Sequence, residues 1–174
     1  MQYFSIRFLT AATDVSDRGI MSDRLHLDRF LPFLLSVTSN RVSERIARAY
    51  ETLFGLTIPE WRLIAVIAES DTITQAQIGE RTRMDKVTVS RAAIALTARG
   101  LLIRSPNSSD RRSHHLSLSG DGRRLYADVA PKALELEARI FSHLDAEELV
   151  QFTATLRRID AAVAEEEQEW SRHR

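Results

Sequence analysis

Four polar side chains between positions 86 and 91 can donate hydrogen bonds to the edges of DNA bases, and two of them are cationic. They are Lys86, Thr88, Ser90 and Arg91. All four lie off the apolar stripe of the predicted helix 85–99, which consists of Val89, Ala93 and Leu96. A recognition helix needs this arrangement, because its N-terminal half faces the major groove while its other face holds to the core. The alternative is an ordinary solvent-facing helix, and the helix alone does not decide between them.

A second group with suitable chemistry is the arginine pair Arg111 and Arg112, which closes the turn-rich segment 105–112. The minor groove is about 6 Å wide and strongly negative, so it accepts a guanidinium well. Asp110 is interpreted as a structural residue that pairs with one of these arginines and fixes the turn. A solvated turn is the alternative for such a pair in isolation. The position of the pair, shortly after two short helices, favours DNA.

Those two short helices have clear start signals. Thr74 is a predicted N-cap with Gln77 completing a capping box, and Asp85 is the predicted N-cap of the second helix, which ends at Gly100. The stub 81–83 alone separates the two helices. So short a link forces a steep crossing angle, which is the helix-turn-helix geometry.

The segments 101–104 and 115–118 are predicted to be strands, and the segment between them is a hairpin with a basic tip. A long amphipathic helix is predicted from Leu27 to about Phe54, with Pro32 near its start. A helix capped by Thr57 and Glu60 follows it, and helices return after Ser119. The expected fold is therefore mainly α with a small β-hairpin wing.

Composition restricts the function further. The 174 residues have a net charge of zero, but residues 80–126 carry ten Lys and Arg against four Asp and Glu, whereas residues 127–174 carry six against eleven. A basic block in a neutral chain indicates a local phosphate-binding surface. The absence of cysteine excludes disulfides, thiolate metal sites and peroxide-sensing thiols, and suits the cytoplasm. No apolar run is long enough for a membrane span, so no membrane partner is expected.

From about Asp23 to Val163 the chain resembles the MarR (multiple-antibiotic-resistance regulator) family of winged helix-turn-helix transcriptional regulators. The motifs, in order, are LTIPEW at 56–61, DKVTVSR at 85–91, RGLL at 99–102, DRR at 110–112 and LSLSGDG at 116–122. The resemblance implies that Arg112 is the wing arginine and that Thr88, Ser90 and Arg91 lie in the recognition helix. It also implies a homodimer that binds double-stranded DNA, often as a repressor released by a small aromatic acid.

The helices predicted before and after the helix-turn-helix and its hairpin have apolar stripes that need a partner. This agrees with a dimer bound to a pseudo-palindromic operator. Four segments are expected. Residues 1–22 form an N-terminal extension, 23–56 the first dimerisation helix, 57–122 the winged helix-turn-helix lobe, and 123–174 the C-terminal dimerisation helices with an acidic tail. Because the resemblance starts after the extension, Met21 is an alternative initiator to Met1.

The candidate effector site combines a polar strip on the first helix with an aromatic ring that could stack on a ligand. It consists of Ser36, Ser39, Asn40 and Trp61. The alternative is that the small residues ease helix packing and that Trp61 belongs to the core.

No metal site or cofactor is expected, because adjacent residues of a strand such as His114 and His115 point to opposite faces. No nucleophile elbow, phosphate-binding glycine loop or HExxH motif is present, so an enzyme is not expected. The remaining alternative is a helical protein-interaction module without specific DNA binding.

Overall fold

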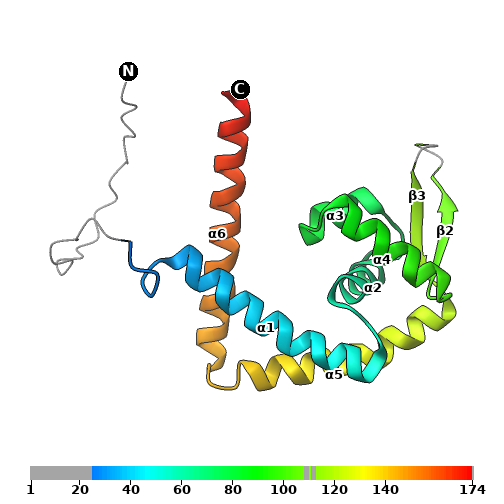
Figure 1. Ribbon diagram of the computed structural model, residues 1–174, viewed down its shortest axis with the longest axis horizontal. Coiled ribbons are helices and arrows are strands. Elements are labelled where there is room, and N and C mark those ends of the chain that lie inside the picture. The colour runs from blue at the N-terminus through cyan, green and yellow to red at the C-terminus, as the bar shows by residue number, and fades with distance from the viewer. Residues whose placement is uncertain (1–24, 108–109, 111–112, 174) are drawn as a thin grey trace. The chain divides into compact units, whose positions relative to one another are not determined.

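The computed structural model describes residues 25–107, 110 and 113–173. It divides into a unit that ends at Thr38 and a unit from Ser39 to Arg174, and each is described separately. The described chain is mostly helical with one small antiparallel sheet, which confirms the predicted fold class. Figure 1 shows three helices, α2 (Ile58–Ser70), α3 (Gln75–Thr82) and α4 (Lys86–Ala98), gathered into one lobe with the hairpin of β2 (Leu102–Pro106) and β3 (His114–Leu118).

The first helix, α1, runs Leu31–Phe54 and is shorter than the predicted helix from Leu27. Residues 27–29 form a turn instead, in which the Arg29 N–H donates to the His26 carbonyl at 3.1 Å. Pro32 explains the difference. Proline has no N–H to donate, so it is tolerated in the first turn of a helix but not further inside.

The lobe contains α2 (Ile58–Ser70), β1 (Ile73–Thr74), α3 (Gln75–Thr82), α4 (Lys86–Ala98), β2 (Leu102–Pro106) and β3 (His114–Leu118). The predicted capping boxes of Thr57 with Glu60 and of Thr74 with Gln77 are both present. Because α3 extends to Thr82, the link between the two short helices is residues 83–85 and not 81–83. Arg83 turns the chain there in the left-handed conformation, with φ 55°.

The sheet has three strands in the order β1-β3-β2, one more than the predicted hairpin. Ile73 of β1 lies opposite Leu116, and Leu102 of β2 lies opposite Leu118. Two residues are too few to show the alternation that marks a strand in a sequence, so β1 gave no signal. Its effect is to fix the start of α3 to the base of the wing.

One apolar core holds the lobe together. Its fully buried large side chains come from every layer: Leu56, Leu63, Ile64, Ile67, Ile78, Val89, Leu96, Leu116 and Val129. The predicted inner stripe of α4 is confirmed, because Val89, Ala93 and Leu96 are each at most 1% exposed. Helix α4 is therefore held by its inner face, which leaves its outer face exposed.

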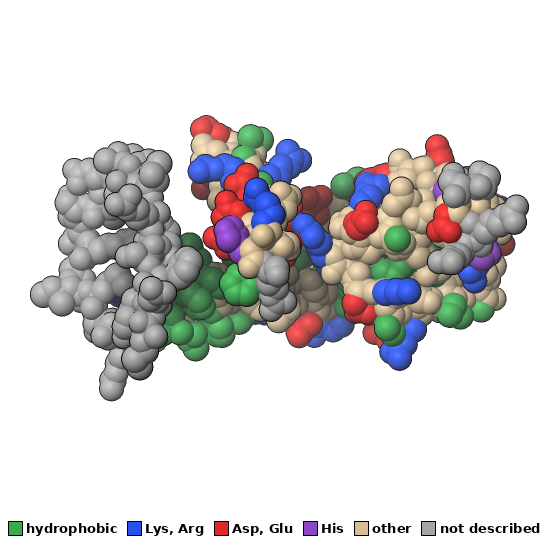
Figure 2. Space-filling model, turned by 90° about the horizontal axis from the view of Figure 1, so that it is seen from above, with side chains coloured by type: hydrophobic (Ala, Val, Ile, Leu, Met, Phe, Trp, Pro, Cys, Tyr) green, Lys and Arg blue, Asp and Glu red, His purple; other side chains and the backbone are tan. Residues whose placement is uncertain are grey.

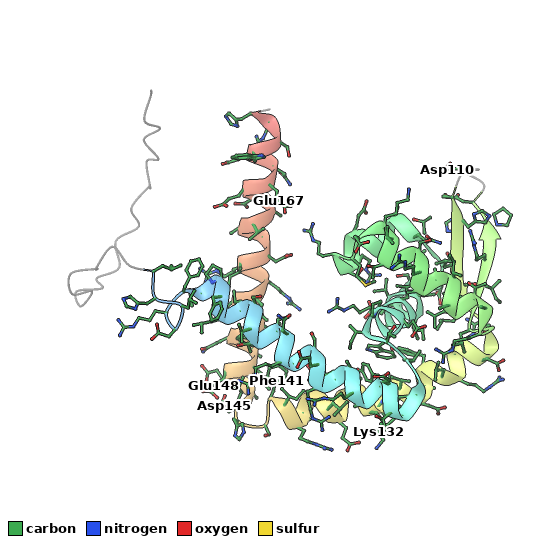
Figure 3. All side chains as sticks on the ribbon, viewed as in Figure 1. Asp110, Lys132, Phe141, Asp145, Glu148 and Glu167 are labelled. Atoms are coloured by element: carbon green, nitrogen blue, oxygen red, sulfur yellow. The ribbon has the colours of Figure 1, made fainter. Side chains whose placement is uncertain are left out.

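Two long helices complete the chain, α5 (Gly120–Ile140) and α6 (Ala146–Arg172). Asp145 and Glu148 form a capping box at the start of α6, where Figure 3 labels both. No residue of α6 is buried. Apolar side chains nevertheless repeat at helical spacing along one face, here called the α6 stripe: Leu149, Phe152, Leu156, Ile159 and Val163. Within the described residues, no helix is long and apolar enough to cross a membrane.

Exposed apolar side chains also line the first part of α1. Leu31, Phe33, Leu34, Leu35 and Val37 are each between 38% and 68% exposed. Hydrophobic side chains reach the surface in patches in Figure 2, where they are drawn in green. Helices with such faces normally bury them against another surface.

Candidate nucleic-acid interface

The start of α4 is fixed by Asp85, as predicted. One carboxylate oxygen, Oδ1, accepts the backbone N–H groups of Val87 and Thr88, both at 2.9 Å. The other, Oδ2, accepts the hydroxyl of Thr88 at 2.7 Å. The first turn of α4 is therefore held by three hydrogen bonds to one carboxylate, at the end that the sequence predicts to face a DNA groove.

The four predicted base-contacting residues of α4 differ in accessibility. Lys86 and Arg91 are exposed, and no ion pair involving either is present among the described residues. Ser90 is half-buried. Thr88 is also half-buried, and its hydroxyl hydrogen is already donated to Asp85. The two cations and Ser90 thus remain free to contact an external partner.

The hydrogen bond from the Thr88 hydroxyl, followed by the one from the Thr88 N–H, lowers the pKa of Asp85 below its ordinary value. A depressed pKa means that the cap contributes stability above the ordinary pKa of aspartate, and that this contribution is lost as the pH falls through the folded-state pKa.

We therefore expect the Asp85→Asn variant to lose less stability than wild type as the pH falls, because asparagine still caps the helix but does not titrate. Urea unfolding from pH 3 to pH 7 measures the effect. Asp85→Ala, which lacks the cap, should be less stable than wild type at pH 7. Identical pH profiles for wild type and Asp85→Asn would show that Asp85 is not the titrating group.

The hairpin between β2 and β3 is closed by polar contacts. Asn107 donates to the Ser113 hydroxyl at 2.8 Å, and the Ser113 N–H donates to the Asp110 carbonyl at 3.0 Å. Asp110 lies at the tip, as Figure 3 shows, and is exposed. The predicted minor-groove residues Arg111 and Arg112 lie outside the described residues.

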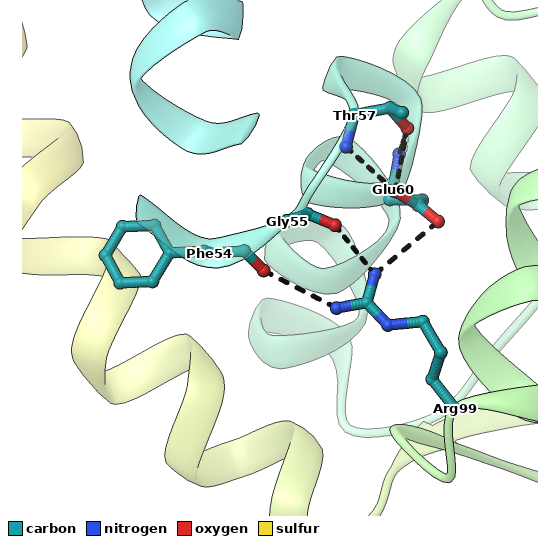
Figure 4. Close-up of polar contacts among 5 residues, drawn as sticks. All are labelled: Phe54, Gly55, Thr57, Glu60 and Arg99. Carbon is teal, nitrogen blue, oxygen red and sulfur yellow. Dashed lines mark hydrogen bonds and ion pairs between the residues drawn. The ribbon is translucent and has the colours of Figure 1, made fainter. Parts of the chain in front are cut away.

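A contact not predicted from the sequence joins the far end of α4 to the helix before the lobe. The Arg99 guanidinium donates to the Gly55 carbonyl at 3.0 Å and to the Phe54 carbonyl at 3.5 Å. It also lies 3.7 Å from the carboxylate of Glu60, which is 8% exposed. Figure 4 shows these three groups converging on the Arg99 guanidinium, while Thr57 bonds to Glu60. Arg99 thus fixes the C-terminal end of α4 to the α1–α2 junction.

The predicted effector residues occupy different surroundings. Trp61 is half-buried between two tyrosines: its ring centroid is 5.3 Å from that of Tyr50 and 5.9 Å from that of Tyr126, the second pair being stacked. Trp61 packs against the core. Ser36, Ser39 and Asn40 are exposed on α1. The polar strip is therefore accessible, whereas the faces of the Trp61 ring are partly covered.

The two adjacent histidines occupy neighbouring positions of β3, where His114 is exposed and His115 is half-buried. Across the described residues, no group of three or more histidine or carboxylate side chains is arranged to hold a metal ion.

A capped helix-turn-helix followed by a hairpin, with the outer face of the second helix free, defines a winged helix-turn-helix protein. The MarR family model matches residues 54–113, which is most of this lobe. The chain is 26% identical over 136 residues to the organic hydroperoxide resistance transcriptional regulator of Bacillus subtilis, which covers 77% of this chain and 89% of that protein. The lobe therefore matches the MarR family over residues 54–113, in agreement with the sequence resemblance.

Solved structures have the same fold. A MarR/EmrR family regulator from Acinetobacter superposes with a TM-score of 0.75 at 23% identity, over 81% of this chain and 99% of that one. BpsR of Bordetella bronchiseptica, whose DNA binding is regulated by 6-hydroxynicotinic acid, superposes with a TM-score of 0.72 at 23% identity, over 79% of this chain and 97% of that one. At this identity the two structures support the fold alone.

Proposed function

We propose that this protein is a cytoplasmic, homodimeric regulator that binds double-stranded DNA at a pseudo-palindromic operator and acts as a repressor. The observation that carries the proposal is the outer face of α4, where Lys86 and Arg91 are exposed while the inner face is locked in the core. In the proposed complex Lys86, Ser90 and Arg91 contact the major groove, and Arg112 enters the minor groove from the wing. Thr88 orders the first turn of the helix through its bond to Asp85.

The homodimer is supported by the α6 stripe and by the apolar residues of α1, which stay largely exposed in the described chain although Phe152 contacts Phe141. Two-fold symmetry would place the two recognition helices about 34 Å apart, one helical turn of DNA. The four-segment division predicted from the sequence belongs to the same proposal, with the lobe at 57–122 between two dimerisation segments.

Duplex DNA binding tests the proposal against the rival protein-interaction module. We expect binding to random duplex DNA that weakens steeply with salt, because phosphate contacts release counterions. A specific duplex, here called the selected operator, should be recoverable from a random pool with wild-type protein. A chain that binds no duplex at low salt would be a protein-interaction module.

The wing has its own test. We expect Arg112→Ala to weaken binding to the selected operator by about 1–3 kcal/mol, with an unchanged thermal unfolding temperature, because the proposed contact of this side chain is with DNA and not with the folded chain. Arg158→Ala is the matched control, since Arg158 is an exposed arginine on α6, outside the proposed DNA interface. Equal affinities of Arg112→Ala and wild type would remove the wing from the mechanism.

We further propose that a small aromatic acid, or its thioester, binds beside Trp61 and the strip of Ser36, Ser39 and Asn40, and releases the protein from DNA. The support is a half-buried tryptophan between two tyrosines, an accessible polar strip, and the regulation of BpsR by 6-hydroxynicotinic acid. Because the chain has no cysteine, a thiol-based peroxide response is not available to it, whatever the Bacillus subtilis relative does.

Titration of hydroxybenzoates, hydroxycinnamates and hydroxynicotinates into the Trp170→Phe variant, where Trp61 is the one tryptophan left, tests the effector. We expect one of them to change Trp61 fluorescence and to weaken operator binding by about 5- to 150-fold. By linkage, operator DNA should weaken the binding of that ligand to the protein by the same factor. If no compound does both, the aromatic effector is wrong and the DNA-binding proposal stands.

A further inference from the structure

Two apolar side chains on the outer face of α4 remain largely exposed in the fold. Val87 is 57% exposed and Ile94 is 60% exposed, although both lie on a helix whose inner face is fully buried. Valine is also a poorer helix former than alanine, so Val87 does not favour the helix through propensity. Its side chain is therefore free for an external contact.

The position of Val87 indicates what that contact is. It is the second residue of α4, in the first turn, and it lies four residues before the exposed cation Arg91, so both share one face of the helix. The neighbouring Thr88 cannot offer its hydroxyl hydrogen, because Asp85 holds it at 2.7 Å. The leading end of the helix thus presents two methyl groups from Val87 between Lys86 and Arg91.

We propose that Val87 reads the C5-methyl group of one thymine in each half-site of the operator. This inference rests on the proposed DNA binding. In the major groove, thymine alone presents a methyl group, and apolar side chains contact it. An adenine, guanine or cytosine edge at that position would lose water from its hydrogen-bonding groups without gaining a partner from valine.

The expected size of the effect follows from burial of one methyl group. Burying one such group contributes about 0.8 kcal/mol, which is about fourfold in affinity. Each half-site contributes once, so removal of both methyl groups should weaken the operator by roughly 16-fold.

Deoxyuridine replaces thymidine without its methyl group and leaves the hydrogen-bonding edges unchanged, so it isolates the contact. Each thymidine of the selected operator is replaced in turn by deoxyuridine, and binding is measured with wild type and with Val87→Ala. We expect one position per half-site where wild type loses about fourfold and Val87→Ala loses nothing. Unchanged thermal unfolding of Val87→Ala confirms that the variant is folded.

Ile94→Ala is the matched control, because Ile94 is an equally exposed apolar residue two turns further along the same face. Ile94→Ala should lose affinity as wild type does at the deoxyuridine position to which Val87→Ala does not respond. If wild type and Val87→Ala respond equally at every thymidine, the inference is overturned while DNA binding stands. If no duplex can be selected at all, it is the proposed function that fails.

Discussion

Operator binding is expected to fall at least about 100-fold when Leu156 and Ile159 are both replaced by glutamate. These residues lie at the middle of the α6 stripe, on a helix with no buried residue in the described chain. In the proposed dimer each glutamate would place a carboxylate in an apolar contact, which costs several kcal/mol, and tenfold in affinity corresponds to 1.4 kcal/mol. A monomer reaches one half-site only.

Analytical ultracentrifugation and operator titration measure the two parts of this prediction. Ala154→Glu combined with Ala161→Glu is the matched control, because it adds the same charge to the opposite face of α6 and should remain dimeric. A dimeric Leu156→Glu/Ile159→Glu variant with full operator affinity would show that the α6 stripe is not the dimer interface.

Replacement of Gly122 by alanine is expected to destabilise the folded chain by about 3 kcal/mol, at the upper end of the usual range for overpacking. An added Cβ would lie 2.2 Å from the carbonyl oxygen of Leu101 and 3.4 Å from the side chain of Leu118. The oxygen cannot easily move away, because it accepts the backbone N–H of Ser119 at 3.0 Å. The first turn of α5 would therefore have to lift off the start of the wing.

Chemical denaturation measures the loss of stability. Gly120→Ala serves as the control, since an added Cβ there meets only the flexible end of Arg124 at 3.7 Å. Both variants carry the same change in helix propensity, so the difference between them reports the steric contact. Equal stability of the two variants would mean that the start of α5 adjusts without cost.

The features predicted correctly from the sequence are those encoded within a few residues. The capping boxes of Thr57 and Thr74 and the cap at Asp85 each depend on partners at most three residues away. The inner stripe of α4 depends on helical periodicity alone. Together these signals sufficed for the fold class and for the outline of the lobe.

The features not predicted depend on residues far apart in the chain. Arg99 meets the Phe54 carbonyl 45 positions away, and β1 exists because Ile73 pairs with Leu116. Two further features are local but were also not predicted. Periodicity places Val89 on the inner face of α4, but the sequence does not show that Val87 is 57% exposed on the outer face. The sequence also does not show that the Thr88 hydroxyl is already bonded to Asp85.

The contact of Arg99 has a consequence for local unfolding. The last turn of α1 contains no basic residue, and its terminal carbonyls accept hydrogen bonds from α4 instead. The end of α1 therefore shares its stability with the lobe, and its backbone amides should exchange with solvent together with those of α4. The cooperative unit that holds α4, the proposed recognition helix, thus extends across the Gly55 junction into the end of α1.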